Sequence, residues 1–231
     1  MKMIGLIGGM SWQSSAEYYR LINELVSQRL GRHHSARLLL YSLDFDPIER
    51  AQREGRWDET AVLLCRAGKG LQRAGADLVL LCTNTMHKLA DAVEEASGLP
   101  LIHIADAAGA AIERAGLRRV GLLGTRFTME DDFYRVRLHE RFGLEVVVPP
   151  EEDRNDVHRI IYDELCHGKV SPASRRLYLK IIAGLVDRGA EGVVLGCTEI
   201  PLLVRPQDVA IPVFDTTQLH AEAAVELALA S

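Results

Sequence analysis

Two short segments, each following a run of apolar residues, carry the side chains best suited to chemistry. Gly196-Cys197-Thr198-Glu199 follows the run at 193–195, and Thr83-Asn84-Thr85 follows the run at 78–82. A thiol at a strand end, next to backbone N–H donors, is expected to have a lowered pKa, and the thiolate is its reactive form. Cys197 is therefore the leading candidate for an acid/base group, and the alternative interpretation is a buried, inert cysteine.

The other three cysteines are weaker candidates. Cys65 lies on the apolar stripe of a predicted helix, which indicates packing. Cys82 is expected to face away from Thr83, because neighbouring residues of a strand point to opposite sides. Cys166 lies near a helix end, where it either packs or lines the site. Four cysteines in 231 residues are too few for a small disulfide scaffold, and no CxxC pair or zinc spacing is present, so we expect reduced thiols.

Composition narrows the class of protein. The chain has 27 basic and 32 acidic side chains and a net charge of -5. This balance argues against binding to nucleic acid or to an anionic membrane. The N-terminal apolar stretch is short and interrupted by glycines, unlike a signal peptide, and no apolar run approaches the roughly 20 residues of a membrane helix. We therefore expect a cytoplasmic protein without a nucleic-acid or membrane partner.

Short apolar runs alternate with longer amphipathic segments along the chain. The predicted strands are residues 3–7, 36–42, 78–82, 101–104, 120–123, 145–148, 193–195 and 212–214. The predicted helices are residues 14–30, 57–74, 85–96, 107–115, 130–142, 156–166 and 172–187, with a last helix from about residue 216 and a turn at 149–153. This alternation predicts an α/β protein with parallel sheets covered by helices on both faces.

An internal repeat divides the chain. Residues 74–84 match residues 188–198, residues 4–9 match 120–125, and residues 99–102 match 211–214, in the same order and each without a gap. Three ordered matches predict two pseudo-symmetric α/β domains. The N-terminal domain would hold residues 1–115 plus 213–231, and the C-terminal domain residues 116–212. The repeat also pairs Cys197 with Thr83, and not with Cys82.

The strand ends predict the place of the site. In parallel sheets, ligands bind outside the carboxyl ends of the strands. Two such domains facing each other would place their strand-end loops around one cleft, and we expect the active site there. The loops are rich in hydroxyl and backbone N–H groups, which suit a carboxylate. His87 follows one of these loops, and we expect it to lie on the helix surface or to support the loop, not to catalyse.

Cofactor motifs are missing from the sequence. The segment 5–9 lacks the third glycine and the helix register of the dinucleotide fingerprint, and no Walker A motif is present. The five lysines are Lys2, Lys69, Lys88, Lys169 and Lys180. A pyridoxal Schiff base would need one of them, and only Lys88 is near a strand-end loop. We therefore expect a mechanism without cofactor or metal.

Three motifs of the chain are shared with a known enzyme family. Gly8-Gly9-Met10, Asn84-Thr85 and Gly196-Cys197-Thr198-Glu199-Ile200 resemble those of the cofactor-independent aspartate/glutamate racemase family. The resemblance covers nearly the whole chain. It is strongest to the bacterial aspartate racemase branch, which includes the YgeA-type amino-acid racemases. It implies two α/β halves with the site between them, an amino-acid substrate, no cofactor and a homodimer.

The resemblance also implies two acid/base groups, usually both cysteines, on opposite faces of the substrate α-carbon. One group removes the α-proton and the other returns a proton on the other face. This chain departs from that pattern, since Thr83 stands where the family usually has cysteine. A hydroxyl is a much weaker acid than a thiol. We therefore predict an unequal pair, with Cys197 as the base for one enantiomer and Thr83 as its opposite-face partner.

The remaining predicted site residues would bind the substrate. The resemblance and the loop positions together select Met10, Gln52, Asn84, Thr85, Thr125, Thr128, Cys166, Thr198 and Glu199. A dicarboxylic substrate also needs a cation for its distal carboxylate. Gln52 and Cys166, which occupy the expected positions, are uncharged, and Arg50, Arg53 or Arg126 could substitute. Acidic amino acids and a broader or neutral range therefore both stay open.

Two other functions fit parts of the pattern. A decarboxylase or isomerase of the same superfamily needs only one cysteine to protonate a carbanion, and would release CO2 from a disubstituted malonate. A non-catalytic amino-acid-binding protein could keep the site and lose half of the chemistry. Exchange of the substrate α-proton in D2O would separate a racemase from such a binder.

Overall fold

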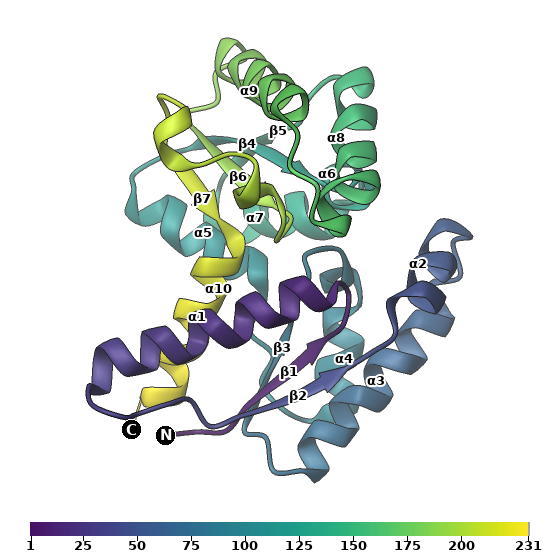
Figure 1. The fold of residues 1–231 in the computed structure, drawn as a ribbon, viewed down its shortest axis with the longest axis vertical. Helices are drawn as coiled ribbons and strands as arrows, with labels where there is room; N and C mark the ends of the chain where they lie inside the picture. The colour runs from purple at the N-terminus through teal and green to yellow at the C-terminus, as the bar shows by residue number, and fades with distance from the viewer. Residues whose placement is uncertain (231) are drawn as a thin grey trace. The chain divides into compact units, whose positions relative to one another are not determined.

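The structure is a computed structural model, and it describes residues 1–230. The chain forms two compact units. The first comprises Met1–His103 and the residues from His220 onward, and the second comprises Ile104–Leu219. The boundary near the C-terminus therefore falls inside one helix, α10 (Thr216–Leu229). Each unit is built on a parallel sheet (Figure 1), which confirms the predicted α/β class.

The first unit has a three-stranded sheet with the order β2-β1-β3. Its other elements besides α10 are, in chain order, β1 (Ile4–Gly8), α1 (Trp12–Leu30), β2 (Leu38–Ser42), α2 (Phe45–Arg53), α3 (Trp57–Arg73), β3 (Leu78–Leu81), the 3-10 helix η1 (Thr85–Leu89) and α4 (Ala90–Ser97). Beyond β3, Leu101 forms a single parallel bridge with Val79. Helices α1 and α10 cover one face of the sheet, and α2, α3 and α4 cover the other (Figure 1).

The second unit has a four-stranded sheet with the order β5-β4-β6-β7. Its elements are α5 (Ile104–Arg114), β4 (Arg119–Gly124), α6 (Arg126–Glu130), α7 (Asp132–Phe142), β5 (Glu145–Val147), α8 (Glu151–Asp163), the 3-10 helices η2 (Leu165–His167), η3 (Ile200–Leu202) and η4 (Pro206–Asp208), α9 (Pro172–Asp187), β6 (Gly192–Gly196) and β7 (Val213–Asp215). Helices α8 and α9 pack on one face of the sheet, and α5 and α7 on the other.

The apolar runs of the central strands explain both sheets. In β3 all four side chains of Leu78–Leu81 are fully buried. Leu78 and Leu80 contact α1 and α10, whereas Val79 and Leu81 contact the helices on the opposite face. A strand buried on both faces has no polar side to alternate with, which is why it appears in the sequence as a continuous apolar run.

The two units repeat the same strand register. Ile4 lies opposite Leu78 in β1 and β3, and Val120 lies opposite Gly192 in β4 and β6. These are the positions that the sequence repeat aligns. Equivalent hydrogen bonds follow, namely Val79 N–H to Pro100 O at 2.9 Å and Val193 N–H to Pro212 O at 2.9 Å. The internal repeat is therefore present in the hydrogen bonding as well as in the sequence.

Several predicted elements are wrong in detail. Helix α2 was not predicted, although its buried Ile48 and Ala51 give it an apolar face. Residues 101–104 contribute one bridge and then begin α5, so they are not a strand. The predicted turn at 149–153 contains the start of α8, whose first turn carries three acidic side chains that stabilise a helix N-terminus. Helix α1 is capped by Ser11, whose Oγ accepts the Ser14 N–H at 3.2 Å.

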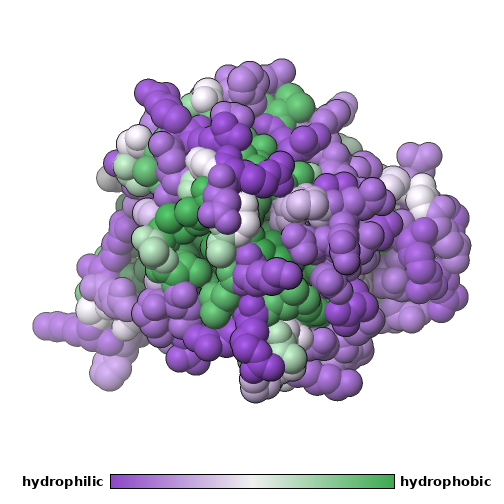
Figure 2. Space-filling model, turned by 90° about the horizontal axis from the view of Figure 1, so that it is seen from above, coloured by the Kyte–Doolittle hydropathy of each residue, from purple (hydrophilic) through white to green (hydrophobic). Residues whose placement is uncertain are grey.

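Hydrophilic side chains cover most of the face shown in Figure 2, with an apolar area near its middle. Large apolar side chains that are exposed include Trp12 on α1 and Val62 on α3. Within residues 1–230, no helix combines the length and the apolarity that crossing a bilayer requires.

Candidate functional site

The loops after β4 and β6 leave neighbouring strands at the same edge of the second sheet. Gly124 and Gly196 lie opposite each other at the ends of these strands. A Cβ atom on Gly124 would lie 2.8 Å from the Gly196 carbonyl oxygen, so a side chain there would push the strand ends apart. Thr125 follows Gly124 and Cys197 follows Gly196. The two glycines therefore let these two loops of the second unit start side by side.

Cys197 is buried, and its thiol is hydrogen-bonded to a carboxylate. Its Sγ donates to Glu199 Oε2 at 3.1 Å, and the Thr198 hydroxyl donates to the same oxygen at 2.6 Å. Only 7% of the Cys197 surface and 5% of the Glu199 surface are exposed. The three residues form a compact thiol, hydroxyl and carboxylate group in which the thiol and the carboxylate are buried and Thr198 is half-buried.

The expected lowering of the Cys197 pKa is wrong. Burial raises the pKa of this thiol well above its ordinary value, and the charge of the Glu199 carboxylate raises it further. The backbone N–H of Glu199 acts in the opposite direction, but it is the weaker influence. A nearby carboxylate disfavours a second negative charge. The resting group is therefore a thiol, with a carboxylate oxygen in position to accept its proton.

The other predicted residues of the second unit lie at the start of α6 and in η2. Thr125 caps α6, with its Oγ1 3.3 Å from the Thr128 N–H and 3.2 Å from the Thr128 hydroxyl, and both side chains are buried. Cys166 lies in η2 and is half-buried. Burial and the charge of Glu199 raise the pKa of Cys166 to about 12. Cys166 is thus a neutral thiol whose electrostatics are linked to Glu199.

The predicted residues of the first unit follow β1, β3 and β2. Thr83 is half-buried, and Asn84 and Thr85 are buried beside it. Met10 follows β1 and packs in the apolar cluster on the α2, α3 and α4 side of the sheet. Gln52 of α2 is buried, with its Nε2 3.8 Å from the sulfur of Met86 in η1. The first unit thus gathers its predicted residues at the carboxyl ends of its strands.

Cys82 has the packing role that strand alternation predicts. Its side chain is fully buried on the α1 and α10 side of the sheet. Burial raises the pKa of the Cys82 thiol far above its ordinary value. Its carbonyl oxygen accepts a hydrogen bond from Ser14 Oγ at 2.8 Å. Cys82 is therefore a core residue, and Thr83 is the residue of this pair that is not sealed in the core.

A family model described as Asp/Glu/Hydantoin racemase matches residues 7–224. The chain belongs to this family.

Solved and curated members support the assignment. A candidate Asp/Glu racemase from Yersinia pestis, whose crystal structure is known, has 53% sequence identity to this chain over the full length of both, and the two structures superpose with a TM-score of 0.93. An aspartate racemase homologue from Pyrococcus horikoshii is 38% identical over 99% of both chains, with a TM-score of 0.85. A glutamate racemase from Roseiflexus is 31% identical over 73% of this chain, which spans 60% of that relative's length. The two-unit fold is therefore that of the Asp/Glu/hydantoin racemases.

One buried cluster in this family member was not predicted. His87, His103 and His220 lie together in the first unit, all at most 5% exposed. The ring centre of His87 is 4.6 Å from that of His103 and 5.4 Å from that of His220. His87 is therefore not on a helix surface, although its contact with the Thr83 carbonyl does support the loop. The three histidines are far apart in sequence, and no local spacing could have shown that they meet.

Among the described residues, no group of three or more His, Cys, Asp or Glu side chains is arranged to hold a metal ion. The histidine cluster is held by hydrogen bonds instead. Tyr18 Oη lies 2.7 Å from His220 Nδ1, and His220 Nε2 lies 2.7 Å from the Ile102 carbonyl oxygen. A carbonyl only accepts, so Nε2 carries the proton and Nδ1 accepts from the tyrosine.

The buried histidines predict a loss of stability in acid. Burial lowers the pKa of His220 from 6.5 to about 4 and holds that of His87 well below its ordinary value. Between the ordinary histidine pKa and the lowered pKa of the buried histidines, the unfolded chain therefore binds more protons than the folded one. The free energy of unfolding falls as the pH falls through this range. His220 alone accounts for up to about 3 kcal/mol once the pH is below 4.

Urea unfolding at pH 7, 5.5 and 4 measures this slope. We expect His220→Gln to flatten it, whereas replacing the exposed His33 and His34 by glutamine removes two histidines and should leave it unchanged. An equal slope in all three proteins would contradict the assignment to the buried cluster.

Proposed function

We propose that the chain is a pyridoxal-independent amino-acid racemase in which Cys197 and Thr83 act on opposite faces of the substrate α-carbon. The single observation that carries the proposal is the buried Cys197 thiol, which follows β6 and is hydrogen-bonded to Glu199. The chain that carries it belongs to the Asp/Glu/hydantoin racemase family. A buried thiol with a carboxylate beside it can be deprotonated without meeting bulk water. Once formed, such a thiolate is a strong base in a poorly solvated environment.

The reaction consists of two proton transfers at the α-carbon, preceded by one from Cys197 to Glu199. Glu199 accepts the Cys197 proton, and the thiolate then removes the α-proton, so that the carbon keeps the electron pair of the broken C–H bond. The Thr83 hydroxyl returns a proton to the other face and is left as an alkoxide. Before the next turnover Glu199 releases its proton to solvent and Thr83 takes one from solvent. Each positioned proton transfer contributes roughly 10²–10⁴-fold to the rate.

The substrate carboxylate needs donors that stabilise the carbanion. We propose Asn84 and Thr85 from the first unit and Thr125, Thr128 and Thr198 from the second, with Met10 as an apolar wall. Hydrogen-bond donors aimed at a developing negative charge are the largest source of stabilisation in many enzymes. These residues are neutral, and all but Thr198 are buried. They suit a substrate whose own ammonium group offsets part of its charge.

Among the three candidate cations for a distal carboxylate, Arg126 stands apart. Arg50 is paired with Asp46 at 2.9 Å and Arg53 with Glu49 at 3.2 Å. Arg126 instead donates to the neutral Asn155 Oδ1 at 2.7 Å, and within residues 1–230 it has no carboxylate partner. Its guanidinium charge is therefore not already neutralised. We propose that Arg126 binds the distal carboxylate of aspartate or glutamate.

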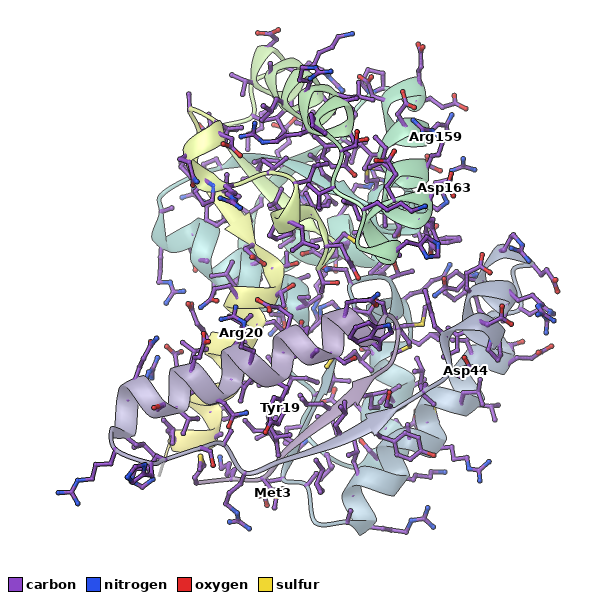
Figure 3. The ribbon with its side chains drawn as sticks, in the orientation of Figure 1. Met3, Tyr19, Arg20, Asp44, Arg159 and Asp163 are labelled. Carbon is purple, nitrogen blue, oxygen red and sulfur yellow. The ribbon has the colours of Figure 1, made fainter. Side chains whose placement is uncertain are left out.

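Helix α8 supports this placement of Arg126. The Arg126 backbone N–H donates to His158 Nδ1 at 3.1 Å, which leaves the proton of a neutral His158 on Nε2, as a second donor. Burial and the charge of Arg126 lower the pKa of His158. Arg159 and Asp163 project from the outer side of α8 (Figure 3). His158 and Asn155 thus hold Arg126 in place without neutralising it.

Replacing Arg126 by glutamine tests the substrate class. We expect kcat/KM for aspartate and glutamate to fall by about 10- to 100-fold, the loss of one charge-assisted hydrogen-bonded contact, and the value for a neutral amino acid to change little. Arg50→Gln is the matched control, since it removes a guanidinium that is already paired. Equal losses for acidic and neutral substrates would contradict this role and favour a broader range.

The decisive experiment for the function uses D2O. The protein is incubated without pyridoxal phosphate with each enantiomer of aspartate, glutamate and several neutral amino acids, and α-deuterium incorporation and inversion are measured separately. Both should occur, and kcat should differ between the two enantiomers because thiol and hydroxyl are unequal acids. A binding protein would exchange nothing, and CO2 release from a disubstituted malonate would instead indicate a decarboxylase.

A further inference from the structure

The main chain around Thr83 is anchored by two side chains. Ser14 Oγ donates to the Cys82 carbonyl at 2.8 Å, and His87 Nδ1 lies 2.8 Å from the Thr83 carbonyl oxygen. Because a carbonyl only accepts, His87 carries its proton on Nδ1 and donates it. The carbonyl groups before and after the Thr83 Cα are therefore both held by hydrogen bonds, and together they set the direction in which the Thr83 side chain leaves the main chain.

His87 itself is held by the buried histidine cluster. Its ring meets the rings of His103 and His220 edge-on. His220 in turn is fixed at both nitrogens, by Tyr18 and by the Ile102 carbonyl. With only 2% of its surface exposed, His87 cannot turn its ring without opening this part of the core. The donor that holds Thr83 is thus rigid.

The other half of the repeat has no such donor. The match that pairs Thr83 with Cys197 places Pro201 at the position of His87. A proline has neither a side-chain donor nor a backbone N–H. The Cys197 carbonyl accepts the backbone N–H of Ile200 at 3.3 Å instead. The two halves of the repeat therefore differ at this position. The half that carries Thr83, the weaker acid of the pair, is the one whose loop carbonyl is held by a side chain, His87.

We propose that His87 is a positioning residue for Thr83, and that its Nδ1–H fixes the loop so that the Thr83 hydroxyl is aimed at the α-carbon. The inference rests on the proposed racemase function. In the step concerned, the O–H bond of Thr83 breaks, the carbanion pair forms the new C–H bond, and the oxygen keeps the electron pair as an alkoxide. A hydroxyl cannot compensate for poor placement by ionising, so this transfer depends strongly on geometry.

The test separates exchange from inversion. In D2O, with the enantiomer that Cys197 deprotonates, wild type should give both deuterated substrate of retained configuration and the inverted product. His87→Leu removes the donor at similar size, so inversion should fall by about 10- to 100-fold while exchange with retention stays within about threefold. His87→Asn, whose Nδ2 is attached to Cγ like the histidine Nδ1, should restore most of the inversion.

Several outcomes would overturn the role of His87. An unchanged ratio of inversion to exchange in His87→Leu would do so, as would equal losses in the leucine and asparagine variants. A merely structural role would lower both reactions together. Nitrogen-15 NMR of wild type provides a check that needs no variant. An Nδ1–H tautomer of His87 is expected, and an Nε2–H tautomer would contradict the proposal. No exchange of any amino acid by wild type would refute the racemase function itself.

Discussion

Replacing Cys197 by alanine should abolish α-proton exchange from the enantiomer that this thiol deprotonates. The expected loss in kcat is about 10²–10⁴-fold, the contribution of one positioned base. KM should change little, because the role proposed for this thiol is at the α-proton and not in binding the substrate carboxylate. Serine should fare almost as badly, since it keeps the hydrogen bond to Glu199 but is a far weaker acid.

Cys65→Ala is the matched control for loss of a thiol. Cys65 lies on α3, outside the predicted site, where its Sγ donates to the Ala92 carbonyl at 3.4 Å. This variant should keep wild-type exchange rates, and circular dichroism should show that both proteins are folded. Retention of more than a tenth of the exchange rate in Cys197→Ala would contradict the assigned role.

Replacing Glu199 by glutamine should have the second largest effect. The carboxylate charge raises the Cys197 pKa, so its removal should lower that pKa. Burial remains, however, and the thiol stays protonated at pH 7, now without an acceptor for its proton. We expect kcat at pH 7 to fall by about 10²-fold and to recover partly as the pH rises towards the thiol pKa.

Two measurements check the role of Glu199. The thiolate absorbance near 240 nm gives the Cys197 pKa, and the pH–rate profile should shift towards alkaline pH. Thr198→Val removes the other hydrogen bond to Glu199 but keeps the charge, so it should leave the thiol pKa close to that of wild type. A full rate at pH 7 in Glu199→Gln would show that the carboxylate is not the proton acceptor.

Much of the fold could be predicted from the sequence, because the central strands are buried on both faces. The run Leu78–Leu81 and the matched positions around Val193 gave both the strands and the repeat. Helix α2 was missed because it is short and contains Pro47 and several charges. A helix this short depends on tertiary packing for its stability, here on the burial of Ile48. Nine residues are too few for sequence periodicity to show such an apolar face clearly.

The site was less predictable than the fold, and for electrostatic reasons. Strand alternation correctly placed Cys82 in the core. The pKa of Cys197 was misjudged because its acidic neighbour at position 199 turns back onto the sulfur, which the sequence does not show. The histidine cluster was invisible because it joins η1, the segment before α5, and α10. Contacts between elements distant along the chain decide these properties.

The first unit includes residues that are made after the whole of the second unit. Ala221, Ala224, Val225 and Ala228 of α10 pack on Ile4, Leu6, Leu78 and Leu80, and His220 completes the histidine cluster. During synthesis, residues 1–103 would leave the ribosome with one face of their sheet covered by α1 alone, while the second unit could already fold. The usual N-terminal-first order is then reversed. The loop that carries Thr83 becomes rigid only after residue 220 has emerged, so a protein truncated after Leu219 would have a formed Cys197 site and an unfinished Thr83 site.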